Sequence, residues 1–291
     1  MFDRFDLRGG IIYGILAALF FTVMGFFVKL LDADVPISLI LFFRFGISLI
    51  VLLPFIIKDF KSIIVVSHPW TFMVRTLMNL LAIGCFFQAL KYSSFIDVLV
   101  LVNTTPFFVP IVAKILFGSK THTTVWIGIS LGFVGVTFIL NPDAGVFHLS
   151  SLLALISGVL GAIGITLVRA LSKTRSIKQI LFYNFFLATV LTAPMSSFSW
   201  QKLSPVSYYL LILIGICGAL YQLCSTLSYA KIPVRISSSF MFLCILFGSL
   251  MDWAILGLIP DRESLIGMGL VILGGLWILY FGRRHIFSNK L

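Results

Sequence analysis

The sequence predicts an all-α integral membrane protein with ten transmembrane helices, arranged as two inverted five-helix repeats. Three observations support this fold class: an apolar composition, ten apolar runs of membrane-spanning length, and segments that recur at a constant offset. Of the 291 residues, 60% are hydrophobic, whereas soluble domains contain roughly 45–50% apolar residues. With a mean hydropathy of +1.12, the chain has more apolar surface than an aqueous fold can bury.

Ten runs approach the ~20 apolar residues that a helix needs to cross a bilayer core. They are predicted to be helices because lipid offers no hydrogen bonds to an open backbone. The predicted spans are residues 10–30, 37–57, 71–90, 98–117, 123–140, 149–171, 178–197, 207–230, 235–257 and 264–282.

The net charge of +11 fits the excess of lysine and arginine in cytoplasmic loops, so no nucleic-acid partner is expected. With the amino terminus inside, sixteen of the 21 basic residues lie on the cytoplasmic side, four lie outside, and Arg44 lies within a span. We therefore expect both termini in the cytoplasm. The first run follows no cleavage-site pattern, so it is predicted to be a retained helix and not a signal peptide.

Two pairs of segments are similar to each other at a nearly constant spacing. ILFFRFGISLIVLLP at residues 40–54 matches ILFYNFFLATVLTAP at residues 180–194, an offset of 140. WIGISLGFVGVTFIL at residues 126–140 matches LIGMGLVILGGLWIL at residues 265–279, an offset of 139. A constant offset in separate segments indicates an internal duplication.

The duplicated units are predicted to be residues 1–146 and 147–291, and the basic residues Lys29 and Arg169 correspond at the same offset of 140. Each unit has an odd number of helices, so the second unit enters the membrane from the opposite side. Inverted repeats of this kind are typical of secondary transporters, whose substrate site lies near the midplane between the halves.

Arg44 lies about 8 residues inside its span, which places it roughly 12 Å deep, near the bilayer midplane. A charge there costs roughly 2.5–3.5 kcal/mol, and the corresponding residue of the second unit, Asn184, is also polar. We infer that this position faces protein or water. Arg44 either binds an anionic group of a substrate or caps backbone carbonyls of a neighbouring helix.

Asp252 is the only carboxylate within the predicted spans. It can pair with Arg44 or Lys29, bind a cationic substrate, or carry a coupling proton; alternatively it is a near-surface residue in contact with water. An arginine and an aspartate in one cavity would suit a zwitterionic, amino-acid-like metabolite.

Uncharged polar residues in the spans predict a polar cavity at the centre, although each one alone is often only an interhelical hydrogen bond. Pro106 interrupts the hydrogen bonding of the fourth span, as a hinge or as a static kink. Glycines of the fifth and tenth spans, such as Gly128 and Gly274, predict a close scaffold contact between helices. The remaining candidate substrate-binding residues are Asn79, Gln88, Asn103, Tyr221, Gln222, Ser238 and Trp253.

The sequence shows no motif for ATP hydrolysis, for catalysis within the membrane or for a pore. No P-loop is present, so ATP-driven transport is not expected, and no cofactor or metal is expected either. A membrane-embedded enzyme or a passive channel is the alternative of another class, but the histidines are scattered and no ring of polar residues lines one helix. The cysteines form no CxxC pair; they are Cys85, Cys217, Cys224 and Cys244, and the histidines are His68, His122, His148 and His285.

The chain resembles the EamA-like branch of the drug/metabolite transporter superfamily. The resemblance rests on FFRFG in the second span, ALKYSS at residues 89–94, Pro106, and LFG…IGISLGFVGV at residues 116–136. It implies a ten-helix carrier of small metabolites, driven by a proton or a counter-substrate, and acting as a monomer or homodimer in the bilayer. Because an arginine at position 44 is common in that family across diverse substrates, the structural role of Arg44 is favoured.

Two further features refine the resemblance. Many members carry a glutamate after the glycine that ends the fourth and ninth helices, whereas this chain has Ser119 and Leu258, so that role does not transfer. FFRF…LIVLLPF at residues 42–55 and HPW…R at residues 68–75 are similar to S-adenosylmethionine uptake carriers of intracellular bacteria. That similarity implies a bacterial inner-membrane location.

Overall fold

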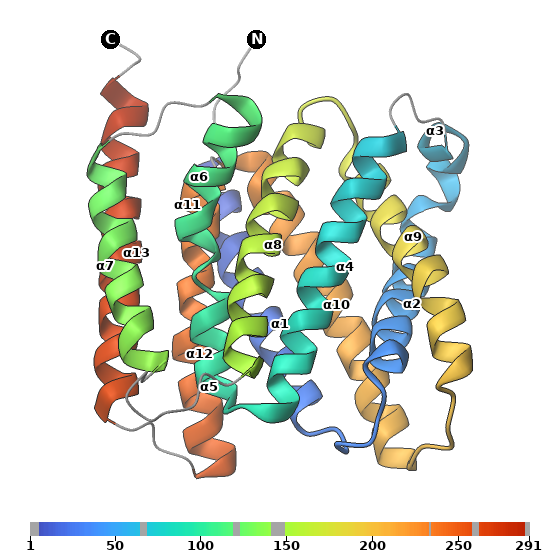
Figure 1. The fold of residues 1–291 in the computed structure, drawn as a ribbon. Helices are drawn as coiled ribbons and strands as arrows, with labels where there is room; N and C mark the ends of the chain where they lie inside the picture. Colours follow the sequence, from blue (N-terminus) through green and yellow to red (C-terminus); the bar gives the residue numbers. More distant parts are fainter. Residues whose placement is uncertain are drawn as a thin grey trace.

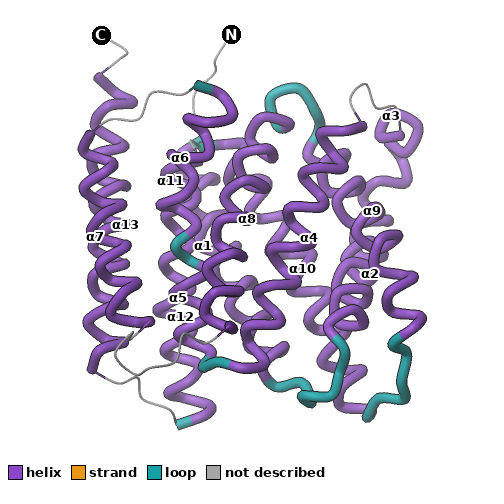
Figure 2. Tube along the Cα trace, in the orientation of Figure 1, coloured by secondary structure: helices purple, strands orange, loops and turns teal. Residues whose placement is uncertain are grey.

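The computed structural model describes residues 6–64, 69–118, 123–140, 149–232, 234–257 and 262–288. Within these residues the chain is a helical bundle without strands, with short loops between helices that run along one axis (Figures 1 and 2). The long helices are α1 (Leu7–Lys29), α2 (Ile37–Ile56), α4 (Pro69–Tyr92), α7 (Thr123–Leu140), α8 (Leu149–Leu171), α9 (Ile177–Phe198), α10 (Pro205–Lys231) and α13 (Arg262–Ser288). The shorter elements are η1 (Ile57–Asp59), α3 (Phe60–Ile64), α5 (Phe95–Val102), α6 (Thr105–Phe117), α11 (Val234–Ser239), η3 (Phe240–Phe242), α12 (Leu243–Met251) and the π-helical turn η4 (Asp252–Leu256).

Eight helical segments of the described chain are long and apolar enough to cross a membrane. Six are the single helices α1, α2, α4, α8, α9 and α10, and two are composites, one of α5 with α6 and one running from α11 to η4. Helices α7 and α13 contain only shorter apolar stretches, Trp126–Gly135 and Leu265–Trp277. The all-helical membrane class is confirmed, while eight of the ten predicted spans meet the length and hydropathy of a membrane helix.

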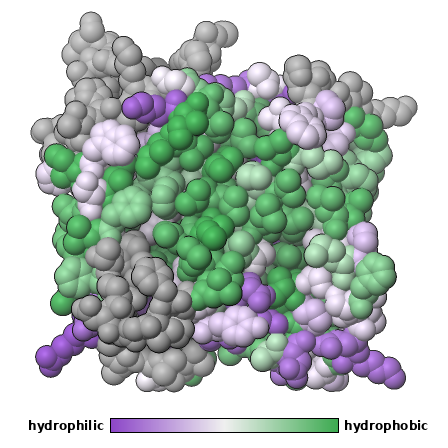
Figure 3. Space-filling model, in the orientation of Figure 1, coloured by the Kyte–Doolittle hydropathy of each residue, from purple (hydrophilic) through white to green (hydrophobic). Residues whose placement is uncertain are grey.

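The outer surface of the bundle is apolar over most of its height. Figure 3 shows a broad hydrophobic band across one face, with hydrophilic residues gathered toward its two ends. Large side chains such as Phe55, Ile115 and Leu250 are exposed on this surface. So many exposed apolar residues require a non-aqueous solvent, which identifies an integral membrane protein.

The fourth and ninth predicted spans are broken. An interruption of the fourth was expected near Pro106, whereas the break in the ninth was not expected. The fourth begins at Phe95, ends its first helix at Val102 and resumes at Thr105, a break visible as a short loop at mid-height between α5 and α6 (Figure 2). Because the span begins at Phe95, Asp97 also lies within it, so the expectation that Asp252 is the only carboxylate inside a span is wrong.

Side chains at the break add hydrogen bonds to the backbone carbonyls. Asn103 Nδ2 donates to the Leu99 carbonyl at 2.7 Å, and Thr104 Oγ1 donates to the Leu101 carbonyl at 2.7 Å. Pro106, in the first turn of α6, has no N–H to continue the α5 ladder. The irregular backbone is therefore satisfied within the protein, as the membrane interior requires.

Helices α7 and α13 lie side by side at one edge of the bundle (Figure 1). A Cβ atom added at Gly135 would lie 2.7 Å from the Gly267 carbonyl oxygen, and one added at Gly274 would lie 2.7 Å from the Gly128 carbonyl oxygen. The two backbones therefore touch at both ends of the contact. This confirms the predicted close packing of the glycine-rich helices.

Gly118 and Gly257 end α6 and η4 in the left-handed backbone region, with φ of 62° and 64°. L-residues rarely adopt this conformation, so glycine is the residue suited to both positions. Ser119 and Leu258, which replace the glutamates of the resembling family, lie outside the described residues.

Candidate functional site

A cavity with several polar side chains in its wall lies between α1, α4, α8 and α10 and beside the break in the fourth span. Its volume of about 50 Å³ holds a few water molecules, so it must widen to admit a metabolite. The lining residues are Phe21, Arg75, Asn79, Ala82, Ile83, Val102, Asn103, Thr105, Ser157, Gly161, Gly164, Ile165, Val168, Tyr221, Gln222, Ser225, Tyr229 and Met241.

Arg75 supplies the positive charge of the cavity. Its side chain is buried in the wall formed by α4, and Tyr221 and Tyr229 of α10 line the same cavity. Arg75 is one of the sixteen basic residues expected on the cytoplasmic side, and its burial in the cavity wall corrects that expectation. The overlooked signal is its spacing of four residues from Asn79, which puts both side chains on one face of α4.

Arg44 lies just behind the cavity wall and does not line the cavity. Its guanidinium carbon lies 4.1 Å from the centroid of the Phe45 ring. Gly218 of α10 leaves room for it, since a Cβ there would lie 3.0 Å from Arg44 Nε. Arg44 interacts electrostatically with Tyr221 and Arg75, so two buried guanidinium groups act on the same region.

Most polar groups of the lining are already hydrogen-bonded within the protein. Ser157 Oγ donates to the Ala82 carbonyl at 2.7 Å, and Thr105 Oγ1 donates to the Gly158 carbonyl at 3.1 Å. Asn79 Nδ2 donates to Asn184 Oδ1 at 3.3 Å, which ties α4 to α9. These contacts fix the walls of the cavity and leave few groups available to a ligand.

The structure brings together four of the predicted binding residues and separates the rest. Asn79, Asn103, Tyr221 and Gln222 line the cavity, and Asn184 contacts it through Asn79. Gln88 instead lines a separate, almost entirely apolar pocket of about 350 Å³ between α2, α4, α8 and α9. Ser238 is buried on α11 outside the lining, and Trp253 is 63% exposed.

Asp252 lies away from the cavity. It interacts electrostatically with Lys29 and Asp97 and not with Arg44, and Lys29 Nζ also donates to the carbonyls of Leu90 and Ser93 at 2.9 and 2.8 Å. Among the described residues that line the cavity none is a carboxylate. Neither Arg44 nor Asp252 is among the residues that line this cavity, so the structure does not bring the two together there.

Sequence reasoning missed several residues of the lining. Ser225 and Tyr229 follow Gln222 on α10 by three and seven residues, so helical periodicity alone puts them on the same face. Ser157 and Thr105 have no such signal, because they meet only when α8 packs against α5 and α6. Of the histidines, three lie outside the described residues, and only the backbone of His285 is described.

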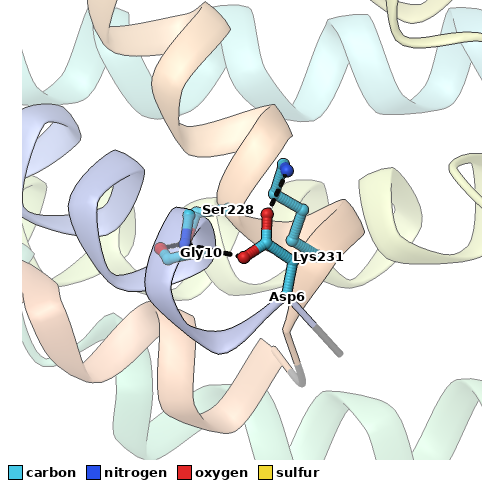
Figure 4. Close-up of polar contacts among 5 residues, drawn as sticks. Asp6, Gly10, Ser228 and Lys231 are labelled. Atoms are coloured by element: carbon cyan, nitrogen blue, oxygen red, sulfur yellow. Dashed lines mark hydrogen bonds and ion pairs between the residues drawn. The ribbon is translucent and has the colours of Figure 1, made fainter. Parts of the chain in front are cut away.

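Polar contacts join α1 and α10 at the end of the bundle near the amino terminus (Figure 4). Lys231 Nζ lies 2.6 Å from Asp6 Oδ2, and Ser228 Oγ donates to the Gly10 carbonyl at 2.8 Å. Asp6 also accepts a hydrogen bond from the Gly9 N–H at 2.9 Å, which caps α1. One carboxylate therefore both starts α1 and connects it to α10.

The contact of Asp6 with Lys231 is expected to weaken in acid. The hydrogen bond from Lys231, followed by that from Gly9, lowers the pKa of Asp6 below its ordinary value. Because its pKa is lowered, the ionised Asp6 stabilises this link between α1 and α10 at pH values above the ordinary aspartate pKa of about 4. The stabilisation is lost as the pH falls below that value. Hydrogen exchange of the first turn of α1, corrected for intrinsic rates, should therefore accelerate below about pH 4.

Asp6→Asn should show the fast exchange at every pH, while the first turn of α9, capped by the Ser176 hydroxyl, serves as an internal reference. Equal pH dependence in Asp6→Asn and in the unsubstituted protein would contradict the assignment to Asp6.

The sequence is similar to that of a known protein family. The sequence profile of the EamA-like transporter family matches residues 8–141 and again residues 148–280. The S-adenosylmethionine uptake transporter of Rickettsia bellii (strain RML369-C) is 24% identical, over 86% of each chain. The pseudopaline exporter CntI of Pseudomonas aeruginosa (strain UCBPP-PA14) is 24% identical, over 91% of this chain and 94% of the exporter.

More distant proteins are also similar. The riboflavin transporter of Rhizobium johnstonii (strain DSM 114642 / LMG 32736 / 3841) is 21% identical, over 93% of this chain and 90% of that protein. One crystal structure has the same fold, with a TM-score of 0.70 and 16% identity, over 95% of this chain and 98% of the other.

Proposed function

Because the chain belongs to the EamA-like transporter family, we propose that it is a secondary active transporter of a small polar, amino-acid-like metabolite that works by alternating access. The observation that carries the proposal is the cavity between α1, α4, α8 and α10, whose wall holds a buried arginine and several uncharged polar side chains inside an apolar bundle. Buried polar and charged groups within a membrane are costly and mark substrate pathways. The proton or counter-substrate gradient remains the proposed energy source.

We also propose that residues 1–146 and 147–291 are inverted repeats. The two matches of the family profile, at residues 8–141 and 148–280, support this division. Glycines at an offset of 139 support it as well, because the Gly135–Gly267 and Gly274–Gly128 contacts are each other's equivalents.

Basic residues at the proposed equivalent positions make equivalent contacts. Lys29, at the end of α1, donates to the Leu90 carbonyl near the end of α4. Arg169, 140 residues later in α8, donates to the Ala230 carbonyl at 2.9 Å near the end of α10. Each cation lies where the carbonyls at a helix carboxyl terminus are without helical partners, a favourable position.

The two helix breaks also make contacts at equivalent positions of the proposed repeats. Gly158 of α8 packs against Thr104, where an added Cβ would lie 3.0 Å from Oγ1. At an offset of 140, Cys244 packs against Ala18 of α1, with its Sγ 3.4 Å from the Ala18 carbonyl. Two broken spans facing the centre are common in carriers built from inverted repeats.

We propose a bacterial inner-membrane location with both termini in the cytoplasm. After Arg75 is assigned to the cavity, fifteen basic residues remain on the proposed cytoplasmic side and four on the outer side. This asymmetry still favours the orientation.

S-adenosylmethionine is the leading specific candidate, because several relatives such as that of Rickettsia bellii are named as its uptake transporters. Purified protein in proteoliposomes is expected to take up labelled S-adenosylmethionine or a neutral amino acid saturably, with the rate changed by a proton gradient or by internal substrate. Protein-free liposomes are the control. Absence of saturable uptake and of exchange for both substrate classes and for riboflavin would overturn the proposed function.

A further inference from the structure

Two residues of the cavity lining have buried polar atoms without a hydrogen-bond partner among the described residues. They are Arg75, through Nε and Nη1, and Gln222, through Oε1. Arg75 is 2% exposed and Gln222 is 4% exposed. A buried donor or acceptor without a partner is destabilising. A ligand that forms hydrogen bonds with these atoms would therefore gain the most binding free energy.

The two residues belong to facing walls. Arg75 comes from α4, whereas Tyr221, Gln222 and Tyr229, which line the same cavity, come from α10. Tyr221 directly precedes Gln222 in the chain, so the guanidinium of Arg75 acts across the cavity on the segment that presents the free amide oxygen. The Tyr221 and Phe21 rings, with centroids 5.0 Å apart, border the same space.

The charged side chains in and beside the described cavity lining are positive. Arg44 adds a second buried guanidinium that interacts with Arg75, and no described lining residue is a carboxylate. Two like charges in a region of low dielectric constant raise each other's energy, and an anionic group bound in the cavity beside Arg75 lowers the energy of both.

We propose, on the basis of the proposed transport function, that the cavity recognises the amino-acid end of its substrate, with Arg75 donating to the carboxylate and Gln222 Oε1 accepting from the neighbouring amino group. A buried amide oxygen without a partner, bordering the same cavity as cationic donors without partners, matches a carboxylate with an adjacent N–H donor better than it matches a phosphate ester or a neutral ring. The tyrosine face beside it takes the rest of the molecule. A neutral acceptor thus supplies what the distant Asp252 does not.

Matched compounds test each half of the assignment. S-adenosylmethionine and methionine are compared with their decarboxylated amines, and methionine is compared with 4-(methylthio)butanoate, which lacks the amino group. Binding is measured by ligand-induced thermal stabilisation of the purified protein, and transport by competition and uptake in proteoliposomes. We expect the affinity for the better-bound carboxylate compound to be about 100-fold or more higher than the affinity for its decarboxylated amine, as for sites built to hydrogen-bond a polar group of the substrate.

Variants separate the two contacts. Arg75→Gln should reduce the carboxylate preference to within about 3-fold, whereas Arg75→Lys should retain part of it because the charge remains. Gln222→Leu should leave the carboxylate preference in place and remove the preference for the amino group. Arg169→Gln is the matched control. Among the described residues Arg169 donates only to backbone carbonyls, so its loss should lower stability without changing either preference.

The outcomes distinguish this assignment from the transport function. Selective binding of carboxylate compounds without any uptake would support the assignment and overturn the transporter proposal. Uptake of riboflavin, phosphate esters or the decarboxylated amines with no carboxylate preference would overturn the assignment and leave transport standing. A preference unchanged in folded Arg75→Gln, or changed equally in Arg169→Gln, would also overturn it.

Discussion

The variant Gly135→Ala is expected to unfold at a clearly lower temperature than the unsubstituted protein and to accumulate poorly in the membrane. The added methyl group would lie 2.7 Å from the Gly267 carbonyl oxygen and 2.9 Å from the Val271 nitrogen, both backbone atoms. Side chains can rotate away from such a contact, but backbone atoms move only if the helices separate. Alanine favours a helix by about 1 kcal/mol over glycine, so a loss of stability here has to come from the interhelical contact.

The loss should be at least about 2 kcal/mol, the usual cost of forcing atoms into a packed contact. Thermal unfolding of the detergent-purified protein and membrane yield measure it. Gly274→Ala, whose Cβ would lie 2.7 Å from the Gly128 carbonyl, should behave alike. Gly269→Ala, on the same helix α13 with no atom within 4 Å of the added carbon, is the matched control and should be neutral or slightly stabilising.

If Gly135→Ala and Gly269→Ala have the same unfolding temperature, the backbone contact between α7 and α13 does not limit stability. The same result would also remove one of the equivalent contacts that support the proposed inverted repeat.

Joining α1 to α10 near the amino terminus is expected to abolish transport reversibly. Asp6 and Lys231 lie 2.6 Å apart through their charged atoms, and they belong to different proposed repeats. Alternating access requires the repeats to separate first at one end and then at the other. A covalent link between these positions should therefore hold the protein with this end closed.

The experiment uses Asp6→Cys with Lys231→Cys and a short, reducible thiol cross-linker. Uptake should fall to below about a tenth of the unlinked rate, as expected when one of the two required states is removed, and should recover on reduction. Each single cysteine variant treated with the cross-linker is the control. The native cysteines, of which Cys217, Cys224 and Cys244 are buried, also remain in those controls. Complete cross-linking with unchanged uptake would contradict alternating access at this end.

Much of the fold follows from local properties of the sequence. Hydropathy is a property of each segment, and a segment enters the membrane as a helix because lipid leaves its backbone no other partners. The composition therefore sufficed for the helical membrane class, and the recurring offset led to the proposed repeats. The glycine spacing sufficed for the α7–α13 contact, since small residues are what allow helices to approach in lipid.

The membership of the cavity was only partly predictable. Asn79, Asn103, Tyr221 and Gln222 were expected in it, because a polar residue in an apolar helix has to face protein or water. The tertiary structure alone put Arg75 in the wall, Arg44 behind it and Asp252 out of reach. A side chain's neighbours depend on the rotation of its helix, on helix breaks, and on packing between segments that are far apart in the chain, and hydropathy contains none of these.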